Sequence, residues 1–378
     1  MHVIYVVLKQ DSAFPSQVLA YLEHLSERFP LRVTLLLGGS GSDTPQALAP
    51  FANHPNRAVK RFRLSPLFAV TDRLNMRAMA HALSQMALDH RTVIHTRGEM
   101  AGHLVIGALH RLEHTTRRVV VDVRGAYREE IRDFWPTPRL IREAKLFRLS
   151  RLYGSIRSAG AITTVSQPLQ TYLEQQYDLP STTTTVIPCV AGPGFRHNPE
   201  RRAIMRKHLG ISETEPVILF STGGEDQWQC LDTITRFLGR LGARGIVLAR
   251  KKLDHPAILS RFVPYAEVPG YLDAADIGLL WRDDHVVNRV ASPIKFGEYL
   301  CSGLPVLANG TVLSVRQRIV SDDVGQVLSD PDDLTTTRFQ QLLAMKRTRI
   351  AAVGEKHYAM QSVVQHYHTL YETLLSEG

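Results

Sequence analysis

Cysteines and long apolar runs are scarce in this sequence. Only three cysteines occur in 378 residues, Cys189, Cys230 and Cys301, and they are far apart. Such a set makes neither a disulfide framework nor a cysteine-based zinc site, so we expect a reducing, cytoplasmic environment. No run of 18 or more apolar residues occurs, so we expect no membrane-spanning helix. The first residues, MHVIYVVLKQDS, lack the basic start and cleavage site of a signal peptide, and we interpret them as a first strand.

The sequence also lacks the two commonest nucleotide-binding signatures. It has no GxxxxGK[ST] motif and no GxGxxG motif directly after a strand. The stretch LLLGGSGSD (35–43) is rich in glycine, but a flexible loop explains it about as well as a phosphate site does. Acidic residues are outnumbered by Lys and Arg, 36 against 45, which gives a formal charge of +9. This charge favours anionic partners, and because no recognition motif accompanies it, we expect no nucleic acid among them.

Short runs of valine, isoleucine and leucine alternate with longer amphipathic segments along the chain. Continuous apolar strands separated by helices indicate parallel sheets that are covered on both faces. There are too many strands for one ordinary sheet, and a segment rich in glycine, proline and polar residues interrupts the pattern at 187–202. The sequence therefore predicts two Rossmann-like, doubly wound α/β domains in tandem. Strands are expected at 3–7, 32–37, 92–96, 118–123, 161–166, 185–188, 216–222, 245–249, 277–281, 305–308 and 324–328, and helices near 15–28, 73–89, 99–112 and 139–158.

The stretch ASPIKFGEYLCSGLPVLANG (291–310) has charged residues where the chain should enter a core. Ser292 and Pro293 suit the N-cap and N1 positions of a helix, which places Lys295 at N3, where a cation opposes the helix dipole. A phosphate in front of the helix would remove this conflict, and Glu298 one turn later would accept two ribose hydroxyls. The alternative is a surface ion pair contributing about 0.2–0.5 kcal/mol. Local physics alone leaves both interpretations open.

This same stretch resembles the donor-site motif of retaining glycosyltransferases with the GT-B fold, in the family 4-like group of bacterial polysaccharide and lipid-linked sugar transferases. Other segments resemble that group in the same order along the chain: VIHTRGEMA (93–101), VVVDVRGAYREE (119–130), AGAITTVSQPLQTYLEQQY (159–177) followed by TVIPCVA (185–191), and VPGYLDAADIGLLW (268–281). The resemblance implies an acceptor-binding domain at 1–188, with a C-terminal helix at 357–378 packing back on it. It implies a nucleotide-sugar-binding domain at 189–356 and a cleft between the two domains.

The function implied by the resemblance is transfer of a sugar from a nucleotide-sugar, with UDP favoured, to a hydroxyl group. The acceptor would be a glycan or a lipid-linked sugar in cell-surface polysaccharide synthesis, and the anomeric configuration would be retained. No metal ion and no cofactor are implied, because positive side chains and a helix start would stabilise the leaving diphosphate. Lys295 would contact the diphosphate and Glu298 the ribose. The other donor-side residues would be Ser292, Pro293, Ile294, Phe296 and Gly297 at the phosphate or donor sugar, Val268 beside the base, and Arg250, Lys251 and Glu225 in the donor cleft.

Four residues are assigned to the catalytic side of the predicted site. Arg124 stands where many relatives have a histidine, and Asp122 shares its strand face. His95 and Arg97 alternate together at the carboxyl end of another predicted strand, where open α/β sheets bind ligands. The structural alternatives are a salt link at the strand end and a histidine whose hydrogen bonds are satisfied in the interior.

Two departures from the family pattern bear on activity. Relatives often have a second glutamate eight positions before Glu298, where this chain has Val290, and the loop STGGEDQWQ (221–229) lacks the cations that relatives have there. Arg250 and Lys251 would supply positive charge, or they are part of a solvated basic run. Two other functions therefore stay open: a non-catalytic relative that binds membrane or partner proteins, and a sugar-nucleotide epimerase.

The segment RLIREAKLFRLSRLYGSIR (139–157) carries six cations against one acid. We interpret it as a basic amphipathic helix on an anionic membrane surface, where each cation contributes about 1 kcal/mol. The alternative is a core-facing helix with a solvated positive face. A second basic cluster, NRAVKRFRL (56–64), lies in the same predicted domain. We therefore expect a cytoplasmic protein that is peripheral on the inner membrane face.

Overall fold

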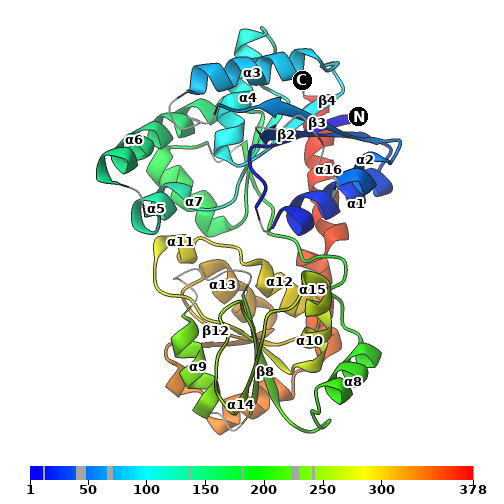
Figure 1. Ribbon diagram of the computed structural model, residues 1–378, viewed down its shortest axis with the longest axis vertical. Helices are drawn as coiled ribbons and strands as arrows, with labels where there is room; N and C mark the ends of the chain where they lie inside the picture. Colours follow the sequence, from blue (N-terminus) through cyan, green and yellow to red (C-terminus); the bar gives the residue numbers. More distant parts are fainter. Residues whose placement is uncertain are drawn as a thin grey trace. The chain divides into compact units, whose positions relative to one another are not determined.

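The chain forms two compact units, each built on one parallel sheet (Figure 1). The computed structural model describes residues 1–11, 13–39, 48–65, 71–136, 138–180, 183–222, 230–240 and 243–377. Unit 1 comprises Met1–Ile187 and Val364–Gly378, and unit 2 comprises Pro188–Val363. Helices cover both faces of each sheet, which confirms the predicted fold class of two doubly wound α/β domains.

Among its described residues, unit 1 has a seven-stranded parallel sheet in the order β3-β2-β1-β4-β5-β6-β7. The chain runs from β1 outward to β3 on one side and then returns to β4 on the other side of β1. Open α/β sheets bind ligands beyond the carboxyl ends of their strands at such a reversal of direction. The strands are β1 (His2–Val7), β2 (Arg32–Gly39), β3 (Arg57–Arg63), β4 (Thr92–Arg97), β5 (Val119–Val123), β6 (Ala161–Thr164) and β7 (Thr184–Val186).

The two faces of the unit 1 sheet have different coverings. The register places Tyr5 beside His95 and Arg97 beside Asp122, so these four side chains share one face. Aromatic residues of α1 and α16 pack on that face. On the other face Gly102 lets α4 approach closely, because an added Cβ would lie 2.7 Å from Val121 Cγ2. The helices are η1 (Pro15–Leu19), α1 (Ala20–Arg28), α2 (Ala49–Ala52), α3 (Asp72–Ser84), α4 (Glu99–Arg111), α5 (Tyr127–Asp133), α6 (Arg139–Ile156), α7 (Gln167–Tyr177) and α16 (Met360–Ser376), of which residues from 364 onward belong to unit 1.

Within the described part of unit 2, six parallel strands follow the order β10-β9-β8-β11-β12-β13. Here the direction reverses between β8 and β11, so a second ligand site is expected beyond their carboxyl ends. The strands are β8 (Val217–Ser221), β9 (Arg244–Leu248), β10 (Ile258–Arg261), β11 (Ile277–Leu280), β12 (Val306–Asn309) and β13 (Gly325–Leu328). The helices are α8 (Pro199–His208), α9 (Leu231–Arg240), η5 (Tyr265–Glu267), α10 (Val268–Ala274), α11 (Val286–Arg289), α12 (Ile294–Cys301), α13 (Leu313–Asp322), η6 (Pro331–Asp333), α14 (Thr336–Leu343) and α15 (Arg347–Tyr358).

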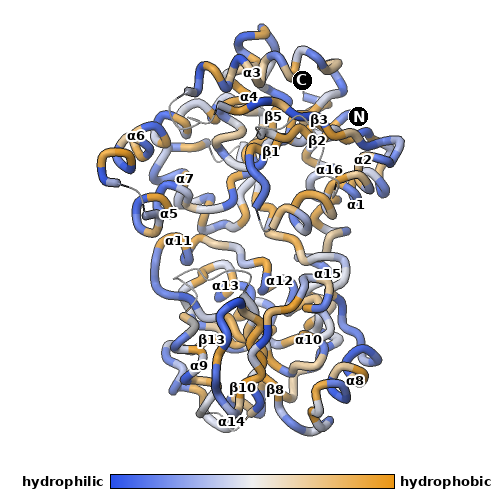
Figure 2. The backbone as a smooth tube through the Cα atoms, in the orientation of Figure 1, coloured by the Kyte–Doolittle hydropathy of each residue, from blue (hydrophilic) through white to orange (hydrophobic). Residues whose placement is uncertain are grey.

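Alternation along the unit 2 strands builds two apolar layers. Val217 and Leu219 of β8 pack with α10 and α12, whereas Ile218 and Phe220 pack with α9 on the opposite face. Figure 2 shows these apolar strands in orange, as it does for β1 and β2 of unit 1. Because both faces of the strands are buried, they appear in the sequence as continuous apolar runs.

Two strands were not predicted from the sequence, β3 and β10. Segment 56–64, interpreted as a basic cluster, contains β3 at one edge of the unit 1 sheet, so its basic residues belong to a strand that was not predicted. Charged side chains are common on edge strands, because they oppose pairing with other chains. Arg57 of β3 is buried and its Nη2 lies 2.7 Å from Glu27 Oε1. Among the helices described in both units, none is long and apolar enough to cross a membrane.

Candidate functional site

The first turn of α12 carries the polar residues that the sequence singled out in unit 2. Pro293 is the N-cap, with an extended ψ of 124°, and the helix begins at Ile294. Ser292 lies before the helix, and its Oγ accepts a hydrogen bond from the Cys189 N–H at 3.3 Å. Ser292 is therefore not the N-cap, and Lys295 occupies N2 instead of the predicted N3. The cation still stands in the first turn, where it opposes the helix dipole.

Glu298 is buried, and both of its carboxylate oxygens accept hydrogen bonds. Lys295 Nζ lies 2.8 Å from Oε2, and the Tyr265 hydroxyl donates to Oε1 at 2.8 Å. Lys295 Nζ also lies 5.6 Å from the centre of the Tyr265 ring, within range of a cation–π interaction. The ion pair that was the alternative interpretation is present, but it is not a surface pair. The Glu298 side chain is 0% exposed and that of Lys295 is 18% exposed.

Tyr265 is a candidate site residue that sequence reasoning missed. Its ring packs against Phe195 with 5.4 Å between centroids, while one face of the residue stays exposed. Gly192 lies beside the hydroxyl, since a Cβ added there would be 2.9 Å from Tyr265 Oη. Tyr265 precedes Glu298 by 33 positions, and no periodicity or motif in the sequence connects the two.

The other donor-side residues divide into core, surface and partly exposed positions. The side chains of Phe296 and Val268 are buried in the apolar layer beneath α12. Gly297 allows α15 to approach, because a Cβ there would lie 2.9 Å from Tyr358 Cβ. These three residues could contact a ligand only through their main chain. Ile294 is partly exposed, and Val290 is buried at the end of α11. Arg250 stacks on Phe262, and Lys251 Nζ lies 3.6 Å from Asp232 Oδ1. Glu225 lies outside the described residues.

In unit 1, Asp122 is a buried acceptor for three side chains. Arg124 Nη1 donates to Oδ2 at 2.9 Å, and Thr163 Oγ1 and Tyr367 Oη donate to Oδ1 at 3.0 and 3.3 Å. Burial by itself would raise the pKa of Asp122, but the positive charge of Arg124 and the other basic groups nearby outweigh it and lower the pKa. Asp122 is therefore an anion that orients Arg124. Arg124 also donates to Gln17 Oε1 at 3.2 Å.

His95 lies in the interior of unit 1, beneath α16. Its Nδ1 is 2.5 Å from the Tyr371 hydroxyl, which in turn lies 2.7 Å from the Tyr21 hydroxyl. Burial lowers the pKa of His95 to about 4, so the ring is neutral at physiological pH. Tyr5 and Tyr367 pack against the imidazole. The geometry favours a structural histidine that holds α16 on the sheet through Nδ1, but its hydrogen bonds are not all satisfied, because the buried Nε2 has no partner among the described residues.

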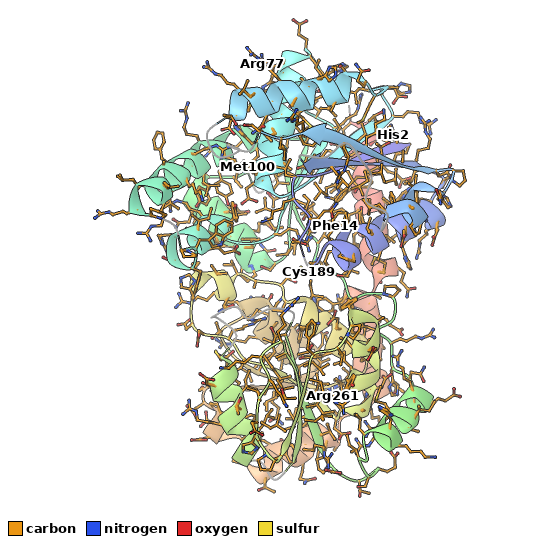
Figure 3. All side chains as sticks on the ribbon, in the orientation of Figure 1. His2, Phe14, Arg77, Met100, Cys189 and Arg261 are labelled. Atoms are coloured by element: carbon orange, nitrogen blue, oxygen red, sulfur yellow. The ribbon has the colours of Figure 1, made fainter. Side chains whose placement is uncertain are left out.

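Arg97 borders a pocket of about 360 Å³ that we name the β1–β4 pocket. The pocket lies where the sheet order reverses, beyond the ends of β1, β4 and β5, and the first turns of α4 and α5 line it. It brings Arg97 and Arg124 together, as predicted, but not His95 or Asp122. No role was predicted for the other polar residues of the pocket, which are Lys9, Asp11, Glu99, Tyr127 and Glu130. Met100, labelled in Figure 3, lines it from the start of α4.

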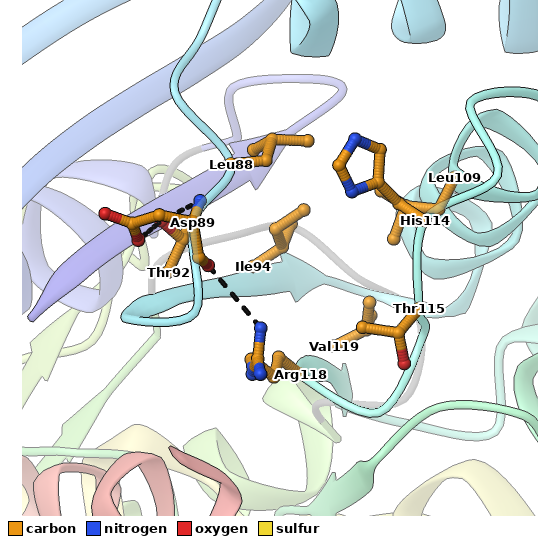
Figure 4. A pocket seen from close by; sticks show the side chains of 9 residues that line it. All are labelled: Leu88, Asp89, Thr92, Ile94, Leu109, His114, Thr115, Arg118 and Val119. Carbon is orange, nitrogen blue, oxygen red and sulfur yellow. Dashed lines mark hydrogen bonds between the residues drawn. The ribbon is translucent and has the colours of Figure 1, made fainter. Parts of the chain in front are cut away.

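A second, much smaller pocket of about 40 Å³ lies at the amino ends of β4 and β5 (Figure 4). Its one carboxylate, Asp89, accepts hydrogen bonds from the Thr92 hydroxyl at 2.7 Å and the Arg91 N–H at 2.9 Å. These two bonds lower the pKa of Asp89 and close a turn. The pocket has room for little more than water, so we assign it no function. In the described ranges no group of three or more His, Cys, Asp or Glu side chains is placed to hold a metal ion.

Helix α6 does not present its cations on one face. Residues spaced by three rotate about 60° at each step around a helix of 3.6 residues per turn, so the five regular cations spread around it. Arg148 turns inward to Asp72, and Lys145 lies over the Trp135 ring at 5.7 Å. The predicted basic face is therefore wrong. The exposed side is mixed instead: Leu140 is 86% exposed and Phe147 68% exposed, beside the exposed charged residues Arg139, Glu143 and Arg151.

The comparisons with known proteins agree with this two-unit architecture. Residues 18–191 match the family model described as Glycosyltransferase Family 4. Sucrose-phosphate synthase from Thermosynechococcus elongatus has the same fold, with a TM-score of 0.68, 14% identity and 100% of both chains covered. HepE from Anabaena, in complex with UDP and glucose, has a TM-score of 0.68 and 13% sequence identity, and the match covers 98% of this chain and 99% of HepE. WaaG, a glycosyltransferase involved in lipopolysaccharide biosynthesis, has a TM-score of 0.57 and 15% sequence identity, and the match covers 99% of this chain and 98% of WaaG.

Among curated proteins, none matches the sequence of the chain. The resemblance seen in the sequence nevertheless holds at both levels, in the family match and in the fold of the whole chain. Residues 18–191 therefore match Glycosyltransferase Family 4, and the two Rossmann-like units have the GT-B fold of the solved structures.

Proposed function

We propose that the protein is a retaining glycosyltransferase that moves a sugar from a nucleotide-sugar to a hydroxyl of a glycan or lipid-linked acceptor. The observation that carries the donor side of this proposal is the buried Glu298 carboxylate in the first turns of α12, which is held by Lys295 and by the hydroxyl of Tyr265. A fully buried carboxylate is expensive to desolvate and needs strong partners. Glu298 has one cation and one hydroxyl as partners, and a ribose diol offers the same kind of donor as that hydroxyl.

The diphosphate would bind in front of α12. The N-cap Pro293 makes no side-chain hydrogen bond to the first turn, so the N–H groups of that turn are not capped in this way. Free N–H groups at a helix start, together with the ammonium of Lys295, form a suitable anion site. They would stabilise the negative charge that develops on the leaving diphosphate, so we propose a reaction that needs neither a metal ion nor a cofactor. Arg250 and Lys251, after β9, would add positive potential.

A UDP-sugar is the donor we favour. HepE, which shares the fold over nearly its whole length, was crystallised with UDP and glucose. The base would lie against the main chain near Val268, at the start of α10, because the side chain of that residue is buried. WaaG, another structural relative, acts in lipopolysaccharide biosynthesis, and we place this chain in cell-surface polysaccharide synthesis by analogy.

Helix α6 would bring the enzyme to an anionic membrane surface on the cytoplasmic side. Leu140, Ala144 and Phe147 follow one another at helical spacing on the exposed face. Arg139 and Arg151 are exposed near the two ends of this apolar strip. Insertion of the apolar side chains, with the cations close to anionic headgroups, is the usual way in which an interfacial helix binds. A lipid-linked acceptor would be reached from that position.

The test is titration of the purified protein with UDP, GDP, ADP, dTDP and CMP by calorimetry. We expect UDP to bind most tightly, and we expect Lys295→Ala and Glu298→Ala each to weaken it by at least about tenfold. Unchanged affinity in both variants would disprove the site. Binding of none of the nucleotides would favour the non-catalytic relative, whereas turnover of a UDP-sugar without an acceptor would favour an epimerase.

A further inference from the structure

A further pocket of unit 1 lies at the amino ends of β1, β2 and β3, and we name it the β2–β3 pocket. Its volume is about 280 Å³, and its lining includes His2 (labelled in Figure 3), Arg32, Thr34, Lys60 and segment 85–87 between α3 and β4. The β1–β4 pocket lies at the opposite, carboxyl ends of the strands, where open α/β sheets bind their substrates. Substrates bound there do not account for the β2–β3 pocket.

The strand register builds the floor of this pocket from one face of the sheet. The pairing of β1 with β2 and of β2 with β3 places His2, Thr34 and Lys60 on that face. Ala58 lies on the same face, and its small side chain leaves room between the larger ones. Lys60 Nζ donates to the Gln85 carbonyl at 3.2 Å, so the ammonium lies beside the segment that follows α3. The pocket is therefore a hollow with a polar floor and one wall made of main chain.

The charged side chains of the lining are all cations. They are Arg32, Arg57 and Lys60, and no carboxylate accompanies them among the described lining residues. Arg57 is already neutralised, because its side chain points to the other face of the sheet and its Nη2 lies 2.7 Å from Glu27 Oε1. Arg32 and Lys60 are exposed and give the pocket two positive charges. Two like charges beside a hollow favour an anionic ligand.

His2 reports the positive potential of the pocket. Its pKa lies below the ordinary value, first because the ring is partly buried and second because Arg32 is close, and the terminal amine and Lys60 act in the same direction. Asp89 opposes them without outweighing them. The imidazole is therefore neutral near pH 7, and its Nε2 lies 2.9 Å from Thr34 Oγ1. An anion in the pocket would favour the protonated ring and so gain a further donor.

The charge and the size of the pocket together select the class of ligand. A phosphate group carries about 1.5–2 negative charges near pH 7 and three acceptor oxygens, which match two cations and an imidazole. Arginine binds phosphate oxygens in a bidentate manner, and lysine binds them as a point charge. The volume of about 280 Å³ is close to the roughly 300 Å³ at which small-molecule sites begin, so there is room for the group that carries the phosphate. Pro55 and Met86 provide an apolar side for that group.

We propose that the β2–β3 pocket binds the phosphate group of a small phosphate ester, with Arg32 and Lys60 pairing with its oxygens and His2 donating to it when protonated. A free metabolite and the headgroup of an anionic lipid share this chemistry. The inference does not depend on the proposed function, because the pocket lies at the other end of the strands from the β1–β4 pocket and involves no residue of α12. We therefore assign the ligand the role of an effector or an anchor, not that of a substrate.

The experiment titrates the full chain with glycerol 3-phosphate and glucose 6-phosphate by calorimetry, with glycerol and glucose as uncharged counterparts. We expect at least one ester to bind and the uncharged compounds not to bind, and we expect Arg32→Gln and Lys60→Gln each to weaken the ester about tenfold. Arg91→Gln is the matched control, because it removes an exposed positive charge at the amino end of β4 that does not line the pocket. Thermal unfolding of each variant verifies that it is folded.

NMR of the His2 ring gives a second readout that does not depend on the calorimetry. The ring signals are identified by their loss in His2→Gln, and the pKa of His2 should rise when the ester binds, because the negative charge favours the imidazolium. Ester binding that is absent, or that is as tight in Arg32→Gln and Lys60→Gln as in the wild type, would overturn the inference. Ester binding that leaves the pKa of His2 unchanged would overturn it as well.

The two sources of the phosphate and the donor site are separated by the same variants. The free esters must bind in either case. Binding to vesicles that contain phosphatidic acid, lost in Arg32→Gln and kept in Arg91→Gln, assigns the pocket to a lipid headgroup, whereas vesicle binding equal in both variants assigns it to a free ester. An ester bound in front of α12 is recognised because it is lost in Lys295→Ala and kept in Arg32→Gln. Intact UDP affinity without ester binding refutes this inference alone.

Discussion

Removing the hydroxyl of Tyr265 tests directly whether the Glu298 carboxylate is a ribose site. In the structure this hydroxyl donates to Glu298 Oε1 at 2.8 Å. If a ribose hydroxyl binds the same oxygen, it must displace the Tyr265 hydroxyl. The loss of the hydrogen bond between Tyr265 and Glu298 then lowers the net free energy of UDP binding. Tyr265→Phe removes that competitor and leaves the ring packed against Phe195. We therefore expect the variant to bind UDP more tightly than the wild type.

The size of the effect follows from the hydrogen bond that is lost. A bond to a charged acceptor contributes about 1.5–3 kcal/mol, and the lower end applies here because the Tyr265 ring is exposed. A gain of about 1.5 kcal/mol corresponds to roughly tenfold higher affinity. Without nucleotide the same substitution leaves one oxygen of a buried carboxylate unpaired, which destabilises the fold by about 1–3 kcal/mol. UDP should restore most of that loss.

Calorimetric titration with UDP and thermal unfolding with and without UDP measure both effects. Tyr271→Phe is the matched control, because Tyr271 lies in the apolar layer on the same side of the sheet. We expect it to leave UDP affinity unchanged. Weaker UDP binding by Tyr265→Phe would show that the hydroxyl contacts the nucleotide itself, and would refute the argument that it occupies the ribose position. Unchanged binding would refute a ribose contact at Glu298 Oε1.

Three further perturbations test unit 1. Burial raises the pKa of Glu99 in the folded chain to about 7 from an ordinary value of 4.5, so Glu99 keeps its proton to a higher pH when the chain is folded. The free energy of unfolding should therefore fall by about 3 kcal/mol between pH 4.5 and 7. Urea titrations of Glu99→Gln should lack this decline, and the same pH dependence in variant and wild type would contradict the burial argument. Tyr371→Phe leaves His95 Nδ1 without its partner, so the free energy of unfolding in urea should fall by about 1–3 kcal/mol while the affinity for UDP stays unchanged. Altered UDP affinity would instead favour a role for His95 in the site. Phe147→Asp on α6 should weaken binding to phosphatidylglycerol-containing vesicles roughly tenfold. The control Val320→Asp, at a similarly exposed position in unit 2, should leave vesicle binding unchanged. Equal loss of binding in both variants would argue against insertion of α6.

The architecture could be predicted because continuous apolar runs report burial on both faces, and most strands have them. β3 and β10, two of the four edge strands, escaped because polar side chains interrupt their apolar residues. In β3, Lys60 and Arg63 point to solvent and only Phe62 is buried among its large apolar residues. Edge strands have one hydrogen-bonding partner and a wetter surface, so their sequences lose the apolar signal that identifies inner strands. The same exposed charges made segment 56–64 appear in the sequence only as a basic cluster.

For the candidate sites, the pattern of charges in the sequence identified residues of interest, but it could not show whether their side chains are buried or exposed to water. Lys295 and Glu298 were found because a cation in the first turn of a helix is unusual. Their spacing could not tell a surface pair from a buried one, since that difference depends on Tyr265, which is distant in sequence and joins them only through the fold. On α6 the regular spacing of cations was misleading, because three residues fall short of a full turn. Glu99 passed unnoticed because the helix dipole favours an acidic residue in the first turn of any helix, so its presence there is ordinary. Only the folded structure shows that this glutamate is withdrawn from water, because its burial depends on the packing of α4 against Tyr153 of α6, which is distant in sequence.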